Sequence, residues 1–327
     1  MHGVKVLGDR NDIIEIANEY LVDEIIIAIP TASAKETKAI LDICKQTGCE
    51  LKRLPGMYQL VNGDVSISKL KDVDVNDLLG RDPITVDLDS IMGYVSDKVV
   101  MVTGGGGSIG SELCRQIASH NPKQLVIVDI YENTTYDIQQ ELKRNYPELD
   151  LVVLIASVRN TKRMDLIFDK YRPEIVYHAA AHKHVPLMEH NCIEAIENNV
   201  FGTKNMVDLC EEYGAERFMM VSTDKAVNPT NVMGATKRMC EMIVQSASTH
   251  GHVKYSATRF GNVLGSAGSV IPLFKRQIAN GGPVTITDKR IIRYFMTIPE
   301  ASQLVLQSGA MAKNGDCLLY TSPSPRD

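Results

Sequence analysis

Short apolar runs alternate with stretches of helical periodicity along most of the chain. The most regular series has apolar runs at residues 99–102, 124–128, 151–155, 175–177 and 217–221, separated by segments with helical spacing. Continuous apolar runs are typical of parallel strands buried on both faces, and the helices between them supply the cover. The pattern therefore predicts an α/β fold with a doubly wound parallel sheet.

Residues 1–62 show the same alternation on a smaller scale. Apolar runs at 4–7, 24–30 and 49–54 predict strands, and residues 35–47 have the spacing of a helix. The first of these strands has no partner strand or helix before it. We therefore expect a partial amino-terminal α/β domain, resembling a nucleotide-binding domain, that begins in mid-fold.

The remaining boundaries follow from changes in composition. Residues 63–97 are rich in Asp, Lys and Gly with weak periodicity, which predicts a connector lying on the second domain. We expect residues 98–316 to form that domain with a small substrate-binding region, and the resemblance given below implies that its carboxyl end is truncated. Residues 317–327 lack periodicity and end in a Pro/Ser run, and we interpret them as a non-native tail.

Composition excludes several classes of protein. The 327 residues are 44% hydrophobic and 23% charged, which is ordinary for a soluble globular protein of about two domains. A net charge of -5 gives no sign of a nucleic-acid surface, and no apolar run approaches the roughly 20 residues that span a bilayer. The seven cysteines form no C-x-x-C pair and the start has no secretory pattern, so we expect reduced thiols and a cytoplasmic location.

A glycine-rich loop follows the run at 99–102. Residues 103–110 read Thr-Gly-Gly-Gly-Gly-Ser-Ile-Gly, and helical spacing begins directly after them. Glycines at this spacing allow a tight turn, close approach to a pyrophosphate and close packing of the helix, whose first amides can bind the phosphates. This order of elements predicts a Rossmann-type dinucleotide site. The residues expected to contact the dinucleotide here are Gly104, Gly107, Ser108, Ile109 and Gly110.

An acidic residue ends the next strand. Asp129 lies about 20 residues beyond the loop, which is the distance expected of a carboxylate that accepts the ribose 2′-hydroxyl. Ile130 and Tyr131 follow it, without an arginine or lysine to bind a 2′-phosphate. The sequence therefore favours NAD over NADP.

Two further strand ends complete the cofactor site. Ser157 and Val158 follow a strand near the position where adenine should lie. Ala179 and Ala180 follow another strand, and their small side chains suit close approach to a flat ligand. We expect all four residues to contribute to cofactor binding.

Histidines gather near the same strand end and raise the question of a metal. His178, His182 and His184 are close in sequence, but Lys183 lies among them and would repel a cation. No cysteine or carboxylate completes a recognisable ligand spacing. We therefore expect no metal, and packing or supporting roles for the histidines.

Polar residues appear abruptly where the run at 217–221 ends. An acid, Asp224, and an amine, Lys225, stand side by side there. Met233 and Lys237 lie four apart on a predicted helix and so share a face. Because ligands bind at the carboxyl ends of strands in open α/β sheets, this arrangement suits proton transfer beside a cofactor. The alternative is a solvated loop with an ordinary exposed lysine.

These motifs support a resemblance. The glycine loop with Met233-x-x-x-Lys237 resembles the extended short-chain dehydrogenase/reductase superfamily, whose usual pattern there is Tyr-x-x-x-Lys. Residues 178–188, 198–205, 222–237 and 293–301 sharpen the likeness to the large UDP-N-acetylglucosamine 4,6-dehydratases of the CapD-like polysaccharide-biosynthesis family, a subgroup with Met at that position. The resemblance covers residues 1–316. Ser157 departs from the Asp that relatives commonly carry.

The resemblance also implies context beyond this chain. It implies a fragment of a longer parent, anchored in the inner membrane with this part facing the cytoplasm, that acts in capsule, O-antigen or protein-glycan synthesis. A homo-oligomer is implied as well. No membrane segment is expected within this chain.

The resemblance implies a reaction as well. NAD takes a hydride from C4 of the sugar, Lys225 removes the C5 proton, Asp224 protonates the departing C6 hydroxyl, and the hydride returns to C6. Lys237 would bond the nicotinamide ribose and Thr223 the sugar 4-hydroxyl. Met233 cannot ionise, so the base for that hydroxyl is unidentified, and a water relayed through Lys237 is our hypothesis.

The substrate is expected to be a UDP-sugar, and two alternative functions remain open. Arg276 and Arg293 are candidates for binding its phosphates. A nucleotide-sugar 4-epimerase would need the same cofactor but no acid–amine pair, and an inactive NAD-binding fragment would need neither. The full set of residues expected to bind substrate is Lys183, Asn199, Asn262, Arg276 and Arg293.

Overall fold

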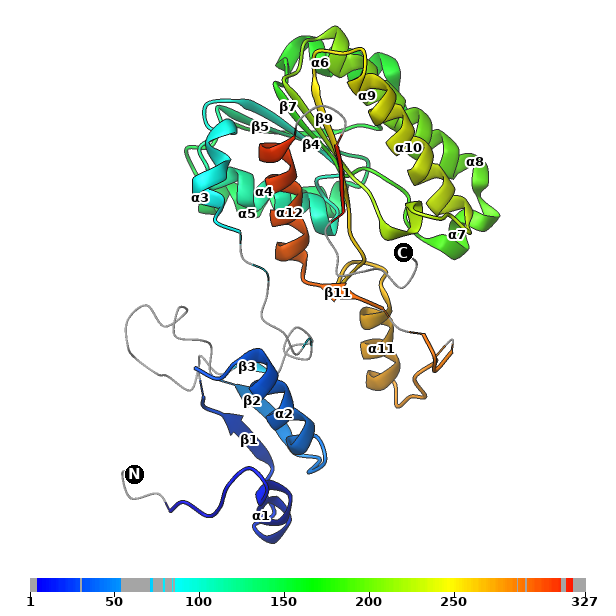
Figure 1. Cartoon of the computed structure of the whole chain (residues 1–327). Helices are drawn as coiled ribbons and strands as arrows, with labels where there is room; N and C mark the ends of the chain where they lie inside the picture. The colour runs from blue at the N-terminus through cyan, green and yellow to red at the C-terminus, as the bar shows by residue number, and fades with distance from the viewer. Residues whose placement is uncertain are drawn as a thin grey trace. The chain divides into compact units, whose positions relative to one another are not determined.

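The chain folds into two compact units. The computed structural model describes residues 5–29, 31–53, 71, 72, 79, 84, 86–286, 288–291, 293–312 and 316–319. The units are Met1–Ile84 and Thr85–Asp327 (Figure 1). Their boundary falls within the stretch 63–97 that the sequence suggested as a connector.

The first unit has a small sheet of order β1-β2-β3. Strands β1 and β2 are parallel, and β2 pairs with β3 in the antiparallel sense. The buried core consists of Ile27, Ile40, Leu41 and Cys44. The elements are α1 (Ile13–Glu19), β1 (Glu24–Ile27), α2 (Ala34–Cys44), β2 (Glu50–Arg53) and β3 (Lys71–Asp72).

Two sequence predictions for this unit need correction. Residues 5–7 form no strand, and residue 4 lies outside the described residues. The run at 24–30 is only partly buried, because Ile26 and Ile29 are 46% and 51% exposed. The start of α2 is well specified, since Ser33 and Glu36 form a capping box.

The second unit is built on a parallel sheet of seven strands, in the order β12-β9-β8-β7-β4-β5-β6. The chain starts at β4 and runs outward first on one side and then on the other, which confirms the predicted doubly wound, Rossmann-type fold. The two directions diverge between β4 and β7. The strands are β4 (Val99–Thr103), β5 (Gln124–Asp129), β6 (Leu151–Ile155), β7 (Ile175–His178), β8 (Arg217–Val221), β9 (Lys254–Arg259) and β12 (Asp316–Leu319).

Helices cover both faces of this sheet (Figure 1). Strand β4 shows the consequence, because Val100 and Val102 pack into the core on one face while Met101 packs into the core on the other. Burial on both faces explains why the strands read as continuous apolar runs. One face is covered by α4 (Ser108–Ala118), α5 (Glu132–Asn145) and α12 (Ile298–Met311), and the other by α6 (Thr161–Tyr171), α9 (Gly202–Glu212) and α10 (Val232–Ser248).

Shorter elements lie between these layers and at the sheet edge. Strands β10 and β11 pair with each other in a separate parallel sheet. Met92 and Val95, within the stretch suggested as a connector, pack into the core of the second unit. The short elements are α3 (Leu88–Ile91), η4 (Met92–Tyr94), α7 (Val185–His190), α8 (Cys192–Ala195), η5 (Ile196–Phe201), η6 (Asp224–Ala226), β10 (Asn262–Val263), α11 (Val270–Ala279) and β11 (Phe295–Met296).

Two expectations for this unit were wrong in detail. The sequence suggested one helix over residues 192–212, but a π-helical turn, η5, separates α8 from α9. This turn holds two buried asparagines, Asn198 and Asn199, and π turns frequently occur at functional sites. The strand expected at 284–287 is not formed by residues 284–286, and residue 287 lies outside the described part.

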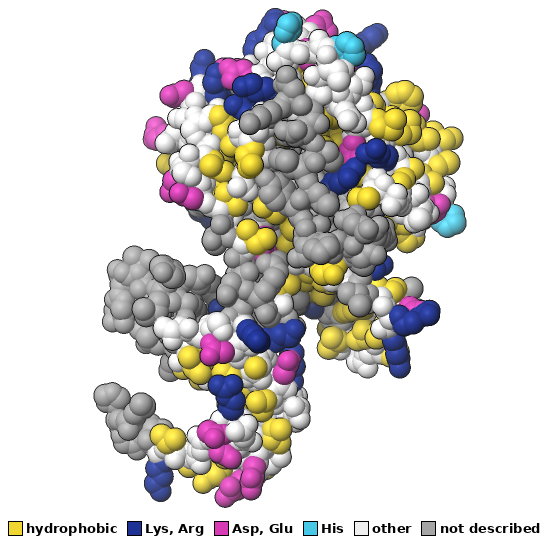
Figure 2. Space-filling model, in the orientation of Figure 1, with side chains coloured by type: hydrophobic (Ala, Val, Ile, Leu, Met, Phe, Trp, Pro, Cys, Tyr) yellow, Lys and Arg dark blue, Asp and Glu magenta, His cyan; other side chains and the backbone are white. Residues whose placement is uncertain are grey.

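Surface composition agrees with the modest net charge. On the face shown in Figure 2, basic and acidic side chains are interspersed on both units. Among the described residues, no helix combines the length and apolar character needed to cross a bilayer.

Candidate active site

The glycine loop forms a tight turn between β4 and α4. Gly104 has a φ of +71°, a conformation that favours glycine. Its N–H donates to Val128 O at 2.8 Å, and its own carbonyl accepts from Gly107 N at 3.0 Å. Helix α4 begins at Ser108, and no side chain caps its amino end. The first amides of α4 are therefore open to an anionic ligand.

The same glycines allow backbone segments to approach closely. A Cβ atom on Gly110 would lie 2.0 Å from the carbonyl oxygen of Gly104. A Cβ atom on Gly104 would lie 2.6 Å from Ala180 N and 2.7 Å from the carbonyl carbon of Ala179. The structure thus brings the loop after β4 against the segment after β7, where both were expected to hold the cofactor.

Asp129 lies beside this loop at the end of β5. Its Oδ2 accepts from Gly106 N at 2.8 Å and its Oδ1 from Tyr131 N at 2.9 Å. Each carboxylate oxygen can accept more than one hydrogen bond, so both retain capacity for a ribose hydroxyl. The residues present therefore fit a dinucleotide.

The end of β6 continues this edge. The N–H of Ala156 donates to the backbone oxygen of Asp129 at 2.9 Å, so Ser157 directly follows the residue that pairs with Asp129. The hydroxyl of Ser157 accepts from Arg159 N at 3.2 Å. Val158 is buried, and its carbonyl accepts from Asn205 Nδ2 at 2.7 Å. Val158 is thereby tied to α9, whereas Ser157 remains half-buried.

His178 is buried and connects three elements through its hydrogen bonds. Its Nδ1 lies 2.7 Å from Thr103 Oγ1 and its Nε2 lies 3.0 Å from Thr203 Oγ1. Burial, with a smaller effect of the Lys237 charge, lowers the pKa of His178 to about 3. The ring is therefore neutral near pH 7 and ties β7 to β4 and α9. Within the described part of the chain, no group of three His, Cys, Asp or Glu could hold a metal ion.

An acid–amine pair follows β8 in the short turn η6. Asp224 Oδ1 accepts from Thr223 Oγ1 at 2.9 Å and from Lys225 Nζ at 3.0 Å. The side chains of Asp224 and Lys225 are 18% and 21% exposed, so the pair is partly withdrawn from water but reachable. Lys225 Nζ also donates to Asn262 Oδ1 of β10 at 3.4 Å. The structure thus brings together Thr223, Asp224, Lys225 and Asn262, which come from two elements.

Helix α10 begins against this turn. Asn231 caps the helix by accepting from Gly234 N at 2.8 Å. A Cβ atom on Gly234 would lie 2.4 Å from Lys225 O, so glycine lets the helix lie against η6. Met233 is buried in an apolar cluster with Met188 and Ala195. Its side chain is therefore a packing group in this arrangement.

Lys237 lies one turn further along α10 and is only 5% exposed. Burial lowers the pKa of its amine, although the nearby Cys240 and Glu241 act in the opposite direction. Among the described residues, the Lys237 amine makes no hydrogen bond or ion pair. A buried amine of this kind requires an acceptor, and a cofactor hydroxyl would supply one.

The sequence did not predict a buried ion pair near this site, between Glu241 of α10 and Arg259 of β9. The Glu241 carboxylate is 3% exposed and contacts Arg259 Nη2 at 2.6 Å. It also accepts from Arg259 Nε at 2.7 Å and from Ser222 Oγ at 2.6 Å. Burial would raise the pKa of Glu241, but these hydrogen bonds hold it below its ordinary value. The sequence shows that Glu241 lies four residues after Lys237 on the predicted helix, but it does not show that Glu241 pairs with Arg259 of β9.

Asn199 was expected to bind substrate, but its amide is fully engaged by the protein. Oδ1 accepts from His182 N at 2.8 Å, and Nδ2 donates to His182 O at 3.0 Å and to Thr236 Oγ1 at 3.1 Å. Asn198 Nδ2 is a further donor to Oδ1 at 3.3 Å. Asn199 therefore connects the segment after β7 to α10 through hydrogen bonds.

The loop after β10 lies near the glycine loop. Lys183 Nζ donates to Ser266 Oγ at 3.4 Å, and Ser108 Oγ accepts from Ala267 N at 3.0 Å. Lys183 is therefore close in space to the amino end of α4. This proximity suits a cation that contacts phosphate groups.

The two arginines expected to bind phosphate lie further out. Arg276 is exposed on α11, and Arg293 is exposed just before β11. Strand β11 pairs with β10 so that Phe295 lies opposite Asn262. Arg293 is therefore two residues from the position beside Asn262, whereas no described hydrogen bond ties Arg276 to the acid–amine pair.

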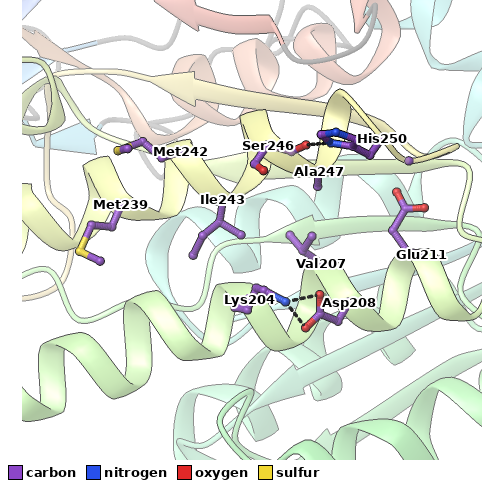
Figure 3. Close-up of a pocket in the computed structure, with 11 residues that line it drawn as sticks. Lys204, Val207, Asp208, Glu211, Met239, Met242, Ile243, Ser246, Ala247 and His250 are labelled. Carbon is purple, nitrogen blue, oxygen red and sulfur yellow. Dashed lines mark hydrogen bonds and ion pairs between the residues drawn. The ribbon is translucent and has the colours of Figure 1, made fainter.

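A separate groove lies between α9 and α10 (Figure 3). It has a volume of about 560 Å³, and its lining includes Val207, Met239 and Met242, with the Lys204–Asp208 ion pair at its edge. None of the residues expected in the active site lines it. The carboxyl edge of the sheet, rather than this groove, is therefore the candidate active site.

Comparisons with known proteins give the same picture. A family described as polysaccharide biosynthesis protein matches residues 100–325. The capsular polysaccharide biosynthesis protein CapD of Staphylococcus aureus is 49% identical over 324 residues, which cover 98% of this chain and 54% of CapD. This chain therefore spans about half the length of that relative.

Relatives closer to this chain in length carry out two related reactions. The UDP-N-acetylglucosamine 4,6-dehydratase (inverting) of Campylobacter jejuni is 32% identical over 69% of this chain and 68% of its own length. The UDP-glucose 4-epimerase of Rickettsia rickettsii is 36% identical over 70% of this chain and 67% of its own length.

Solved structures confirm the fold. Pen from Bacillus thuringiensis is 32% identical, with a TM-score of 0.65 over 70% of each chain. DesIV, a dTDP-glucose 4,6-dehydratase from Streptomyces venezuelae solved with NAD and TYD, has a TM-score of 0.61 over 68% of this chain and 74% of DesIV. Its 19% identity supports a likeness of fold alone. The chain belongs to the CapD-like polysaccharide biosynthesis family, whose members include nucleotide-sugar dehydratases and epimerases with the short-chain dehydrogenase/reductase fold.

Proposed function

We propose that this chain carries the catalytic site of a 4,6-dehydratase that converts UDP-N-acetylglucosamine to a UDP-4-keto-6-deoxy sugar. The observation that carries the proposal is the ion pair of Asp224 and Lys225, held by Thr223 at the carboxyl end of β8. Strand β8 is next to β7, and the crevice between β7 and β4 is where ligands bind in this fold. An epimerase has no step that needs this pair.

The proposed cofactor is NAD. The loop glycines would cradle its pyrophosphate, Asp129 would accept its adenosine ribose hydroxyl, and Lys237 would donate to its nicotinamide ribose. When bound, NAD would accept a hydride from C4 and return it to C6. Support for NAD over NADP comes from the carboxylate of Asp129, which would repel a 2′-phosphate.

The acid–amine pair would then perform the elimination. Once C4 is a ketone, the C5 hydrogen is acidic, and Lys225 as a neutral amine would take it. Asp224 as a neutral acid would give its proton to the departing C6 hydroxyl, which leaves as water. General acid and base groups of this kind typically contribute about 10²–10⁴-fold to a rate.

The starting protonation state is one proton transfer away from the observed ion pair. Moving a proton from Lys225 Nζ to Asp224 Oδ1, across 3.0 Å, gives the amine and the acid that the elimination needs. After the elimination, Lys225 holds the C5 proton and Asp224 is ionised, so the ion pair returns. As the hydride returns to C6, Lys225 would give a proton back to C5, and the proton released from the sugar 4-hydroxyl would restore the neutral acid of Asp224. The hydrogen bond that Thr223 donates to Asp224 and the one that Lys225 donates to Asn262 keep the two groups in place.

Product mass distinguishes this proposal from its rivals. Incubating the chain with UDP-N-acetylglucosamine and NAD should give a product lighter by one water. An unchanged mass with a new C4 epimer would instead identify an epimerase. A chain that binds NAD but leaves the sugar unchanged would contradict catalysis by this fragment, and the longer parent would then be tested in the same way.

A further inference from the structure

Lys237 and Glu241 have the spacing of a helical ion pair but do not form one. They lie four residues apart on α10, and residues at this spacing are neighbours on a helix surface. Both are buried, at 5% and 4% exposed. A buried amine beside a buried carboxylate should pair strongly, because neither is solvated by water. Something must therefore hold the carboxylate away from the amine.

Arg259, at the end of β9, binds the Glu241 carboxylate. Its guanidinium donates two hydrogen bonds to it, from Nε to Oε1 at 2.7 Å and from Nη2 to Oε2 at 2.6 Å. Such two-pronged contacts fix the direction of a carboxylate as well as its position. Ser222 adds a bond to Oε1 at 2.6 Å, and the more exposed Arg238 adds one to Oε2 at 3.2 Å.

We propose that Arg259 is a positioning residue that diverts Glu241 from Lys237, so that the Lys237 amine remains available to the hydroxyls of the cofactor ribose. The inference rests on the proposed function only in naming a ribose as the partner of Lys237. Without Arg259, Glu241 would turn to the amine four residues away and occupy it.

The same contact also aligns the reacting groups. Ser222 directly precedes Thr223 and Asp224, so Glu241 joins α10 to the end of β8 as well as to β9. Burial lowers the pKa of Lys237 and Cys240 and Glu241, on the same helix, act to raise it, while burial and the Lys237 charge lower the pKa of His178 on β7. Helix α10 also packs against η6, where the Asp224 carboxylate is already paired with Lys225. Glu241 is therefore the carboxylate on α10 that would compete for the Lys237 amine.

The test compares NAD affinity, measured by calorimetry, in wild type and three variants of the whole chain. R259Q should bind NAD about tenfold more weakly, because the released carboxylate competes for Lys237. The double variant R259Q/E241Q should recover affinity to within about threefold of wild type, because the competitor is gone. R238Q, the matched control, should match wild type, since Arg238 is half-exposed and makes one hydrogen bond to Glu241, against the two made by Arg259, within the described part of the chain.

A merely structural role predicts no rescue, so equal losses in R259Q and in the double variant would overturn the proposal. Should R259Q fail to fold, R259K and R259K/E241Q take its place, with an expected loss of about threefold that the second variant recovers.

A crystal structure of R259Q without cofactor separates this inference from the proposed function. It should show Glu241 within hydrogen-bonding distance of Lys237 Nζ, whether or not the chain binds NAD. A carboxylate that stays on Ser222 and Arg238 would overturn the inference. Failure of wild type to bind NAD would count against the proposed cofactor alone.

Discussion

The carboxyl edge of the sheet has two halves that differ in composition, here called the glycine half and the charged half. On the half formed by β4, β5 and β6, the site is mostly backbone, and its key residues are glycines that leave room for a ligand. On the half formed by β7, β8 and β9, the site is a set of charged side chains held by one another. The first half is shaped to bind, and the second is equipped to move protons.

This difference separates two kinds of failure. Adding atoms at the loop glycines should block cofactor binding, whereas removing the Lys225 amine should stop chemistry and leave cofactor binding intact. The first three of the following experiments test whether binding and chemistry can be separated in this way.

The largest effect is expected from K225M. Removing the amine should lower turnover by about 10²–10⁴-fold, since a general base is lost, while NAD affinity stays within twofold or so. Product formation is followed by mass spectrometry and NAD affinity by calorimetry. K204M is the matched control, because Lys204 forms an exposed ion pair on α9 and should leave turnover unchanged. A K225M variant with normal turnover would refute the assigned base.

G110A should produce the converse result. The added methyl carbon would lie 2.0 Å from Gly104 O, so the loop must shift, at a cost of about 1–3 kcal/mol. NAD affinity should fall by about 10–100-fold, measured by calorimetry. G93A is the control, because nothing lies within 4 Å of a Cβ atom at Gly93. Equal affinities for the two variants would show that the loop does not hold the dinucleotide.

A smaller loss is expected from D129A. A charge-assisted hydrogen bond is worth about 1.5–3 kcal/mol, so NAD affinity should fall roughly tenfold or somewhat more. The preference for NAD over NADP should fall with it. D150A removes an exposed carboxylate beside the start of β6, at the opposite end of the strands, and should bind NAD like wild type. An unchanged cofactor preference in D129A would contradict the role of Asp129.

The smallest effect concerns stability and involves His178. Its pKa in the folded chain is about 3, against an ordinary 6.5, so only the unfolded chain takes up its proton as pH falls below about 6.5. The stability from this neutral ring is present above that pH and is lost as pH drops toward 3, by at most about 1.4 kcal/mol per unit.

Denaturant unfolding between pH 7 and pH 5 measures this slope while most carboxylates stay ionised. H178N should flatten it, whereas H250Q, at an exposed site, should not. An equal slope in H178N and wild type would show that His178 is not held neutral by the fold.

The sequence predicted the glycine half better than the charged half. The loop glycines act through backbone geometry that is set within a few residues. The spacing of Gly104, Gly107 and Gly110 alone therefore predicts a tight loop of the dinucleotide-binding kind. The parallel strands were visible for a related reason, because burial on both faces leaves an apolar run. Residues 5–7 and 284–286 show the limit of that signal, since short apolar runs without partners form no strand.

The charged half depends on contacts between distant residues. Glu241 and Arg259 come from α10 and β9, and their pairing follows from the packing of the helix on the sheet. The hydrogen bonds of the Asn199 amide could not be predicted from its own segment, because its partners His182 and Thr236 lie in other segments of the chain. Asp224 and Lys225 were the exception, because a contact between two residues that are adjacent in the sequence can be predicted from the sequence itself.

The most direct test of the account is the reaction of UDP-N-acetylglucosamine with this chain and NAD in deuterated water. If Lys225 removes the C5 proton and Asp224 releases the C6 hydroxyl as water, the 4-keto-6-deoxy product should carry deuterium at C5, and K225M should form this product about 10²–10⁴-fold more slowly. A product without deuterium at C5, or a sugar that changes only at C4, would contradict the account.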